Sequence, residues 1–331
     1  MSAVDWDISP RQPSLWQARA YSSTALAQLH EALEAGLSHA GVPLVTAVAG
    51  GSLGRLEASP VSDVDLIVFV ADGAPGCDER IPGLGHAFRA AGLRAPKPDG
   101  IYARPIGIAA ILDPAARGSL TEAPQLFGSR IQVLLDGRPV CRAQQFAELR
   151  EAILRWYASG TGAPGWTHLM NDLSRYLHAY AGWQQFKYTR SDDDGWLLRQ
   201  AKLRSSRIVT FAGLLFLLAE HGRQARADLT WLLAHLDKTP LERVLYVMAQ
   251  YDDVDAAQLL ADYAGVHARL ADPDIRRELI AASPRTADEP VQCDAYTEIH
   301  ALGDSMMNAL TRFALARQHD WPLKIFRNWL L

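Results

Sequence analysis

The spacing of hydrophobic residues predicts a long amphipathic helix near the start of the chain. Across residues 22–40, apolar side chains recur at three- and four-residue steps, which places them on one face of a helix. Ser22 or Ser23 can cap its start, and Gly41 ends it. The apolar positions that carry this pattern are Leu26, Leu29, Leu33 and Leu37.

Two short apolar runs follow, and both predict strands. Residues 44–49 are too few for a helix and lie between Pro43 and a pair of glycines. Residues 64–70 are apolar and β-branched, which is typical of a buried strand. Later in this first half, the pattern predicts a helix over 80–91, a strand over 101–111 inside the proline-broken stretch 92–118, and a strand over 131–135.

The second half shows helical periodicity throughout. Clusters of Gly, Pro or Asp separate its predicted helices, which cover 143–159, 166–188, 197–220, 225–235, 241–251, 256–270 and 296–318. The sequence therefore predicts an α+β protein, in which a small mixed-sheet domain (1–142) is followed by an all-helical domain (143–331).

Composition narrows the class of protein. The 331 residues are 49% hydrophobic and 21% charged, a globular mixture, and the net charge of −4 excludes a strongly basic nucleic-acid coat while leaving a local basic face open. The longest apolar run, 208–219, is shorter than the roughly 20 residues of a membrane span, and the first residues lack a secretory pattern. We therefore expect a cytoplasmic protein with no membrane partner.

The cysteines and histidines show no metal-binding spacing in the sequence. Cys77, Cys141 and Cys293 are scattered, and no CxxC motif occurs. This pattern fits a reducing compartment and predicts neither a disulfide framework nor a cysteine-based metal site. The ten histidines include no HExxH motif, so no zinc site is expected.

Candidate chemistry is concentrated in residues 48–69. Gly50, Gly51 and Ser52 form a turn after the first strand, and the second strand opens with Asp63 and Asp65. Because side chains alternate along a strand, both carboxylates project from one face, where a divalent cation such as Mg²⁺ would offset their repulsion. Glycines let a backbone approach a ligand closely, and amide groups at such a turn can face phosphate oxygens. Together these features predict phosphoryl or nucleotidyl transfer.

This segment resembles the active-site signature of the DNA polymerase beta-like nucleotidyltransferase superfamily. Gly51, Ser52, Asp63 and Asp65 match the family pattern directly. The longer form, with Arg55, looks most like bacterial proteins related to the PII-uridylyltransferase nucleotidyltransferase domain. Weaker likeness to that group extends over residues 130–140 and 196–203.

The resemblance implies a site and a mechanism. Asp63 and Asp65 would hold one or two Mg²⁺ ions, and the turn, from Gly50 through Ser52 and with Arg55, would bind the triphosphate of an NTP. The family adds a third carboxylate from a later strand that helps to deprotonate the acceptor. Asp99 is the predicted residue for this role, preferred over Asp113.

The helical domain offers further candidates for nucleotide binding. Relatives commonly place a helical-domain lysine over the β- and γ-phosphates, and Lys202, with Arg199 on the same helix face, matches that role. Tyr188 is the candidate for stacking on the base. A solvated basic face and an aromatic core are the alternative interpretations of these residues.

The resemblance implies an Mg²⁺-dependent nucleotidyltransferase. Its partners would be an NTP and an acceptor hydroxyl on a protein or small molecule, with release of pyrophosphate; the charge balance does not favour an RNA acceptor. Two alternatives stay open: a cyclic or oligonucleotide second-messenger synthase of the bacterial immune type, and a nucleotide-binding sensor without catalysis.

Overall fold

The computed structural model describes residues 10–40, 43–73, 84–94, 104–158, 166–188, 195–224, 228–284 and 291–330, with the backbone alone at 36–40, 183–188 and 328–330. It confirms the α+β class, because one four-stranded mixed sheet occurs together with many helices. The chain forms two compact units. The sheet unit comprises Gln17–His168 and Ala227–Thr239, and the helical unit comprises Met1–Trp16, Leu169–Arg226 and Pro240–Leu331.

The sheet is built around the first predicted strand. Its order is β3-β2-β1-β4, with β1 antiparallel to both β2 and β4 and with β3 parallel to β2. The strands are β1 (Leu44–Gly50), β2 (Asp65–Val70), β3 (Ile106–Gly107) and β4 (Arg138–Cys141). Since β1 is central, the turn at its end is held by neighbours on both sides.

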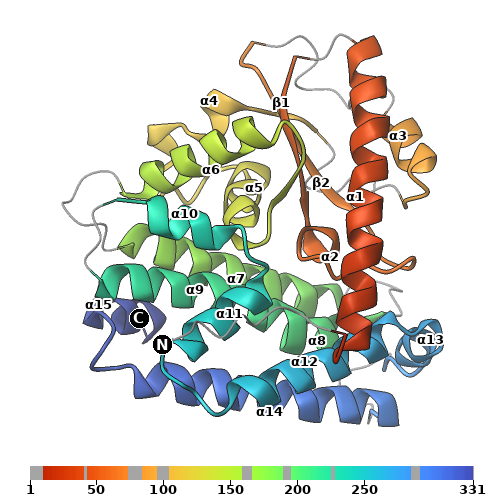
Figure 1. Cartoon of the computed structure of the whole chain (residues 1–331), viewed down its shortest axis with the longest axis vertical. Helices are drawn as coiled ribbons and strands as arrows, with labels where there is room; N and C mark the ends of the chain where they lie inside the picture. The colour runs from red at the N-terminus through yellow and green to blue at the C-terminus, as the bar shows by residue number, and fades with distance from the viewer. Residues whose placement is uncertain are drawn as a thin grey trace. The chain divides into compact units, whose positions relative to one another are not determined.

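Helices cover the two faces of this sheet (Figure 1). On one face, α1 (Pro13–Ala40) and α3 (Leu84–Ala90) share a hydrophobic core with alternate residues of β1 and β2. On the other, α5 (Pro124–Leu135) and α6 (Ala143–Ala158) contact β1. The remaining helices of the unit are short: α2 (Gly51–Gly54), α4 (Ile108–Ile111), η1 (Pro114–Ala116) and α10 (Thr230–Leu236).

The helical unit consists of longer, closely packed helices. Helix α9 packs against α11, and α12 packs against α14. A π-helical turn, Leu203–Arg207, joins α8 to α9. The helices are α7 (Thr167–Tyr188), α8 (Trp196–Lys202), α9 (Ile208–Arg223), α11 (Pro240–Ala249), α12 (Ala256–Ala271), α13 (Pro273–Ala281), α14 (Asp294–Ala316) and α15 (Leu323–Leu330).

Three sequence-based predictions of local structure are wrong. Residues 131–135 form the end of α5 and not a strand. In the predicted strand 101–111, the described part contains only the two residues of β3, followed by α4. Ser22 does not cap a helix: α1 begins at Pro13, and the buried Ser22 hydroxyl accepts a hydrogen bond from the Ala58 amide at 2.9 Å.

The predicted boundary after residue 142 falls between β4 and α6. In the structure both elements belong to the sheet unit. Strand β4 and helix α13 were not predicted.

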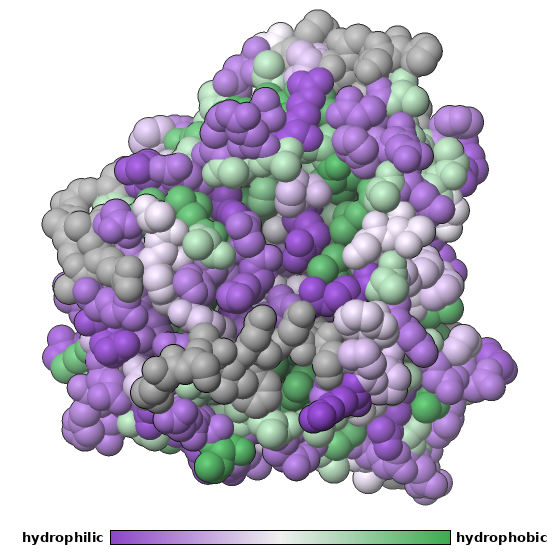
Figure 2. Space-filling model, in the orientation of Figure 1, coloured by the Kyte–Doolittle hydropathy of each residue, from purple (hydrophilic) through white to green (hydrophobic). Residues whose placement is uncertain are grey.

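None of the described helices is both long and apolar enough to cross a membrane. On the face of the molecule shown in Figure 2, hydrophilic residues predominate and hydrophobic residues are scattered among them.

Candidate functional site

The glycine turn after β1 lies directly against the first carboxylate of β2. The register of the two strands pairs Gly50 with Asp65. Gly51 adopts a left-handed backbone conformation with φ of +61°, which favours glycine. A Cβ atom added at Gly51 would lie 2.6 Å from Oδ2 of Asp65, so any side chain there would collide with the carboxylate. The predicted phosphate-binding turn and the predicted metal ligand are therefore adjacent.

The two acids lie at solvent-accessible positions where β2 begins, Asp65 as its first residue and Asp63 two positions before it. Val64 and Leu66 are buried, whereas Asp65 is partly exposed and Asp63 is exposed, which is the alternation expected of a strand. Asp63 forms a bridge with Arg94, and the Arg94 Nη1 atom lies 3.4 Å from its Oδ1. Both side chains of this ion pair are about two-thirds exposed, at 67% and 66%. An exposed pair of this kind contributes little, so it leaves Asp63 accessible to a cation.

A buried polar network supports the turn from behind. Arg55 donates from Nε to Glu57 and from Nη1 to Asp136, each at 2.8 Å, and all three side chains are almost fully buried. The other carboxylate oxygen of Asp136 accepts a hydrogen bond from Gln132, whose side chain packs against Gly50. This network connects α5 to the segment that follows the turn and fixes where the turn lies.

The end of α2 is held by close backbone contact. A Cβ atom added at Gly54 would lie 2.2 Å from the carbonyl oxygen of Asp136 and 2.6 Å from that of Ala49. Arg138 on β4 also donates from Nε to the Gly54 carbonyl at 3.0 Å. No side chain fits at position 54, so the glycine there is a packing requirement.

The structure brings part of the predicted site together. Gly50, Gly51 and Asp65 converge at the turn, with Ser52 partly exposed beside them and Asp63 two positions before Asp65. Arg55 was predicted to bind nucleotide, but its guanidinium is buried in the network described above. In this position Arg55 supports the turn.

The remaining predicted residues stay predictions. Asp99 lies outside the described residues. The alternative acid, Asp113, is exposed and accepts a hydrogen bond from the Ala115 amide at 2.9 Å, which caps η1. Arg199 and Lys202 are half-buried residues of α8 in the helical unit, and Tyr188 ends α7, where only the backbone is described.

Sequence reasoning missed the residues that hold the turn in place. Gln132, Asp136 and Arg138 all fall within the stretch 130–140, for which the sequence predicts a strand over 131–135 and shows a weaker resemblance, but no site residue. Since residues 131–135 were predicted as a strand, the helical face that carries Gln132 toward Gly50 could not be recognised. The signal in the sequence that points to this contact is Gln132 itself, a polar residue inside the otherwise apolar run 131–135.

The residues at the turn fit a magnesium–phosphate complex. Asp63 and Asp65 provide carboxylate oxygens, the donors that Mg²⁺ prefers, at accessible positions. The first amide groups of a helix have no partner within that helix, and α2 begins at Gly51 itself. At Gly51 the space that a Cβ would fill is taken by the Asp65 carboxylate, so an ion held by Asp65 would lie close to the start of α2.

Comparison with known proteins does not identify this chain. No protein-family model, no curated protein and no solved structure matches it.

Proposed function

We propose that this protein is an Mg²⁺-dependent nucleotidyltransferase, which transfers a nucleoside monophosphate from an NTP to an acceptor hydroxyl. The observation that carries the proposal is the proximity of the glycine turn to Asp65: Gly50 pairs with Asp65 in the sheet, and a Cβ atom added at Gly51 would lie 2.6 Å from the Asp65 carboxylate. A metal ion held by Asp65 would therefore lie beside the turn that would face the phosphates. Adjacent metal and phosphate sites are what transfer of a nucleotidyl group requires.

Some residues of the site would bind the metal and the nucleotide, and others hold the glycine turn in position. Asp63 and Asp65 would hold the metal, and the backbone of Gly50, Gly51 and Ser52 would face the triphosphate. Mg²⁺, when bound, would neutralise charge on the phosphates during transfer. The buried pair of Arg55 and Asp136 acts through the turn, by keeping the glycines against Asp65.

The reaction balances without a further co-reactant. The acceptor oxygen forms a bond to the α-phosphorus, the bond from that phosphorus to the bridging oxygen breaks, and pyrophosphate leaves. The proton of the acceptor hydroxyl passes to a base, the role predicted for Asp99. Acceptors of either predicted class, protein or small molecule, fit this scheme.

The test is transfer of label from α-³²P-labelled NTPs, with Mg²⁺ and fractionated protein and small-molecule acceptors. We expect label on one class of acceptor, and loss of that label in the double variant Asp63→Asn plus Asp65→Asn, which should stay folded because neither side chain is fully buried. Asp274→Asn is the matched control, since it removes an exposed acid of α13 that pairs with Arg277 and has no predicted role in the site. Label transfer by the double variant at the wild-type rate would contradict the proposal.

The same assay separates the alternatives. A cyclic or oligomeric product formed without any acceptor would identify a second-messenger synthase. Nucleotide binding without pyrophosphate release from any fraction would replace the transferase proposal with the sensor.

A further inference from the structure

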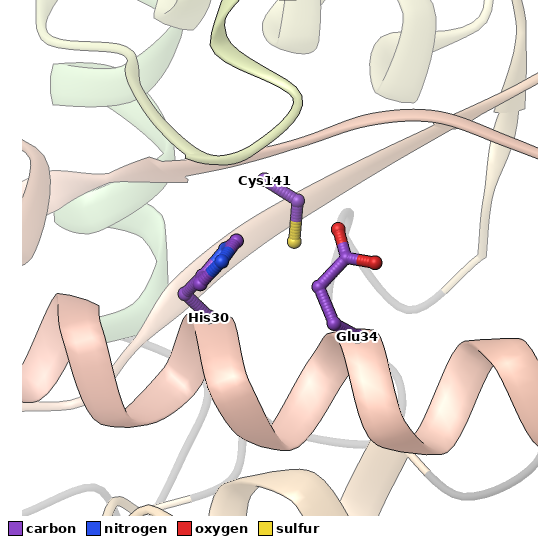
Figure 3. A group of neighbouring side chains, drawn as sticks. All are labelled: His30, Glu34 and Cys141. Carbon is purple, nitrogen blue, oxygen red and sulfur yellow. The ribbon is translucent and has the colours of Figure 1, made fainter.

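A second group of potential ligands lies between α1 and β4, away from the glycine turn in the sequence. His30 and Glu34 come from α1, and Cys141 is the last residue of β4. One ligand atom from each residue lies within 4.8 Å of the other two. Figure 3 shows the His30 and Glu34 side chains rising from the helix toward Cys141, whose thiol points toward the helix.

Both elements hold these side chains in place. His30 and Glu34 are four residues apart, so they occupy one face of α1. The neighbouring residues Leu29 and Leu33 are buried in the core and fix the rotation of the helix. The backbone of Cys141 is held to β1, because its carbonyl oxygen accepts a hydrogen bond from the Thr46 hydroxyl at 2.8 Å.

One ring nitrogen of His30 has a backbone partner. Its Nδ1 atom lies 2.9 Å from the carbonyl oxygen of Val140. If Nδ1 carries the proton of that hydrogen bond, Nε2 keeps its lone pair. Histidines that bind metals usually donate their other ring N–H to a carbonyl or carboxylate in this manner.

We propose that His30, Glu34 and Cys141 form a binding site for a zinc-class divalent ion, with the fourth coordination position open to solvent. Imidazole nitrogen, carboxylate oxygen and thiolate sulfur are the ligands that Zn²⁺ takes in tetrahedral sites. A thiolate ligand disfavours Mg²⁺ and Ca²⁺, so this site would select a different ion from the one proposed at Asp63 and Asp65. The proposal stands independently of the nucleotidyltransferase activity.

The burial of the three residues is compatible with entry of an ion. Cys141 is buried, Glu34 is half-buried and His30 is exposed, which leaves a path from solvent along His30. Burial, with the Glu34 carboxylate beside it, raises the pKa of the Cys141 thiol to about 12 in the metal-free protein. When the sulfur–metal bond forms, the thiol proton is released to solvent. The bound ion would join α1 to β4 and so stabilise the sheet unit.

The test is titration of the untagged, metal-free chain with Co²⁺, which reports on its ligands by absorption. We expect one Co²⁺ per chain, with a near-ultraviolet thiolate-to-cobalt charge-transfer band that Zn²⁺ abolishes and excess Mg²⁺ leaves unchanged. Cys141→Ser should remove the band. Cys293→Ser is the matched control, because Cys293 is also buried but donates its thiol hydrogen to Glu278 at 3.3 Å, in the helical unit.

A second variant keeps the test decisive if Cys141→Ser does not fold. The double variant His30→Gln plus Glu34→Gln changes only exposed and half-buried positions of α1, and circular dichroism checks its fold. Loss of an outer-shell partner alone costs about 10- to 100-fold in metal affinity, so loss of two ligands should weaken Co²⁺ binding at least that much. The proposal is overturned if the folded wild-type chain shows no charge-transfer band, if the band survives in Cys141→Ser, or if the double variant binds Co²⁺ as the wild type does.

Discussion

At the scale of single residues, the conformation of Gly51 decides whether the candidate site can form. A left-handed φ costs a residue with a Cβ atom roughly 1–2 kcal/mol. Here the cost is compounded, because the Cβ would also lie 2.6 Å from the Asp65 carboxylate. The substitution would therefore push the turn and the acid apart.

We predict that Gly51→Ala abolishes Mg²⁺-dependent binding of NTP, and that it destabilises the fold by more than the conformational cost alone. Gly118→Ala is the matched control: Gly118 has a φ of +68° and no heavy atom within 4 Å of its added Cβ, so it should lose only about 1 kcal/mol and keep binding. Chemical denaturation and a binding assay on both variants provide the measurements. Equal behaviour of the two variants would contradict the geometry assigned to Gly51.

The residues of the turn could be predicted from sequence because a local motif carries them. The glycines, Ser52 and the alternating acids lie within a short segment, and strand alternation alone places Asp63 and Asp65 on one face. The burial of Arg55 could not be predicted in this way. Its partner Asp136 lies far along the chain, and only the tertiary structure brings the two together.

At the scale of elements, α5 explains both the main error in the predicted fold and the position of the turn. Every residue of this helix from Gly128 to Leu135 is buried, including Arg130. A helix buried on all sides lacks the amphipathic spacing that identifies helices, and its apolar run 131–135 has the composition of a strand. Its last turn places Gln132 against Gly50, so α5 determines the position of the glycines.

We predict that Asp136→Asn destabilises the protein by about 3 kcal/mol, because it breaks a buried ion pair and leaves the Arg55 charge with fewer partners. NTP binding should weaken at the same time, since the turn loses its support. The control is Glu151→Gln, which breaks an ion pair with Arg155 that is largely exposed and should cost less than about 1 kcal/mol. Thermal and urea unfolding compare the two. An unfolding curve for Asp136→Asn that matches the wild type would show that the network does not support the turn.

At the scale of the whole molecule, the two compact units are not divided at residue 142, where the predicted strands end and a series of predicted helices begins. The sheet unit includes α6 and also receives the distant segment Ala227–Thr239. In that segment Leu232 and Leu236 of α10 are buried, and Asp237 pairs with Arg150 of α6. Hydrophobic periodicity identifies helices but does not show which hydrophobic core each helix joins. The sequence alone therefore could not assign α6 and α10 to the unit that contains the sheet.

We predict that a fragment ending at residue 142 does not fold on its own. It would lack α6, which contacts β1 and contributes the buried Ile153 and Leu154, and so would expose apolar surface of β1. The full chain should unfold cooperatively, whereas the fragment should show neither a cooperative transition nor dispersed amide resonances. A cooperative unfolding transition of the fragment would instead support a boundary between residues 142 and 143.

The most direct test of the central claim is calorimetric titration of the full chain with Mg²⁺ complexes of the four common NTPs, repeated in EDTA and with Asp63→Asn plus Asp65→Asn. The account predicts saturable binding of at least one complex at one site per chain, lost in EDTA and in the double variant. Absence of binding by a folded wild-type chain, or binding that the double variant retains at full affinity, would contradict it.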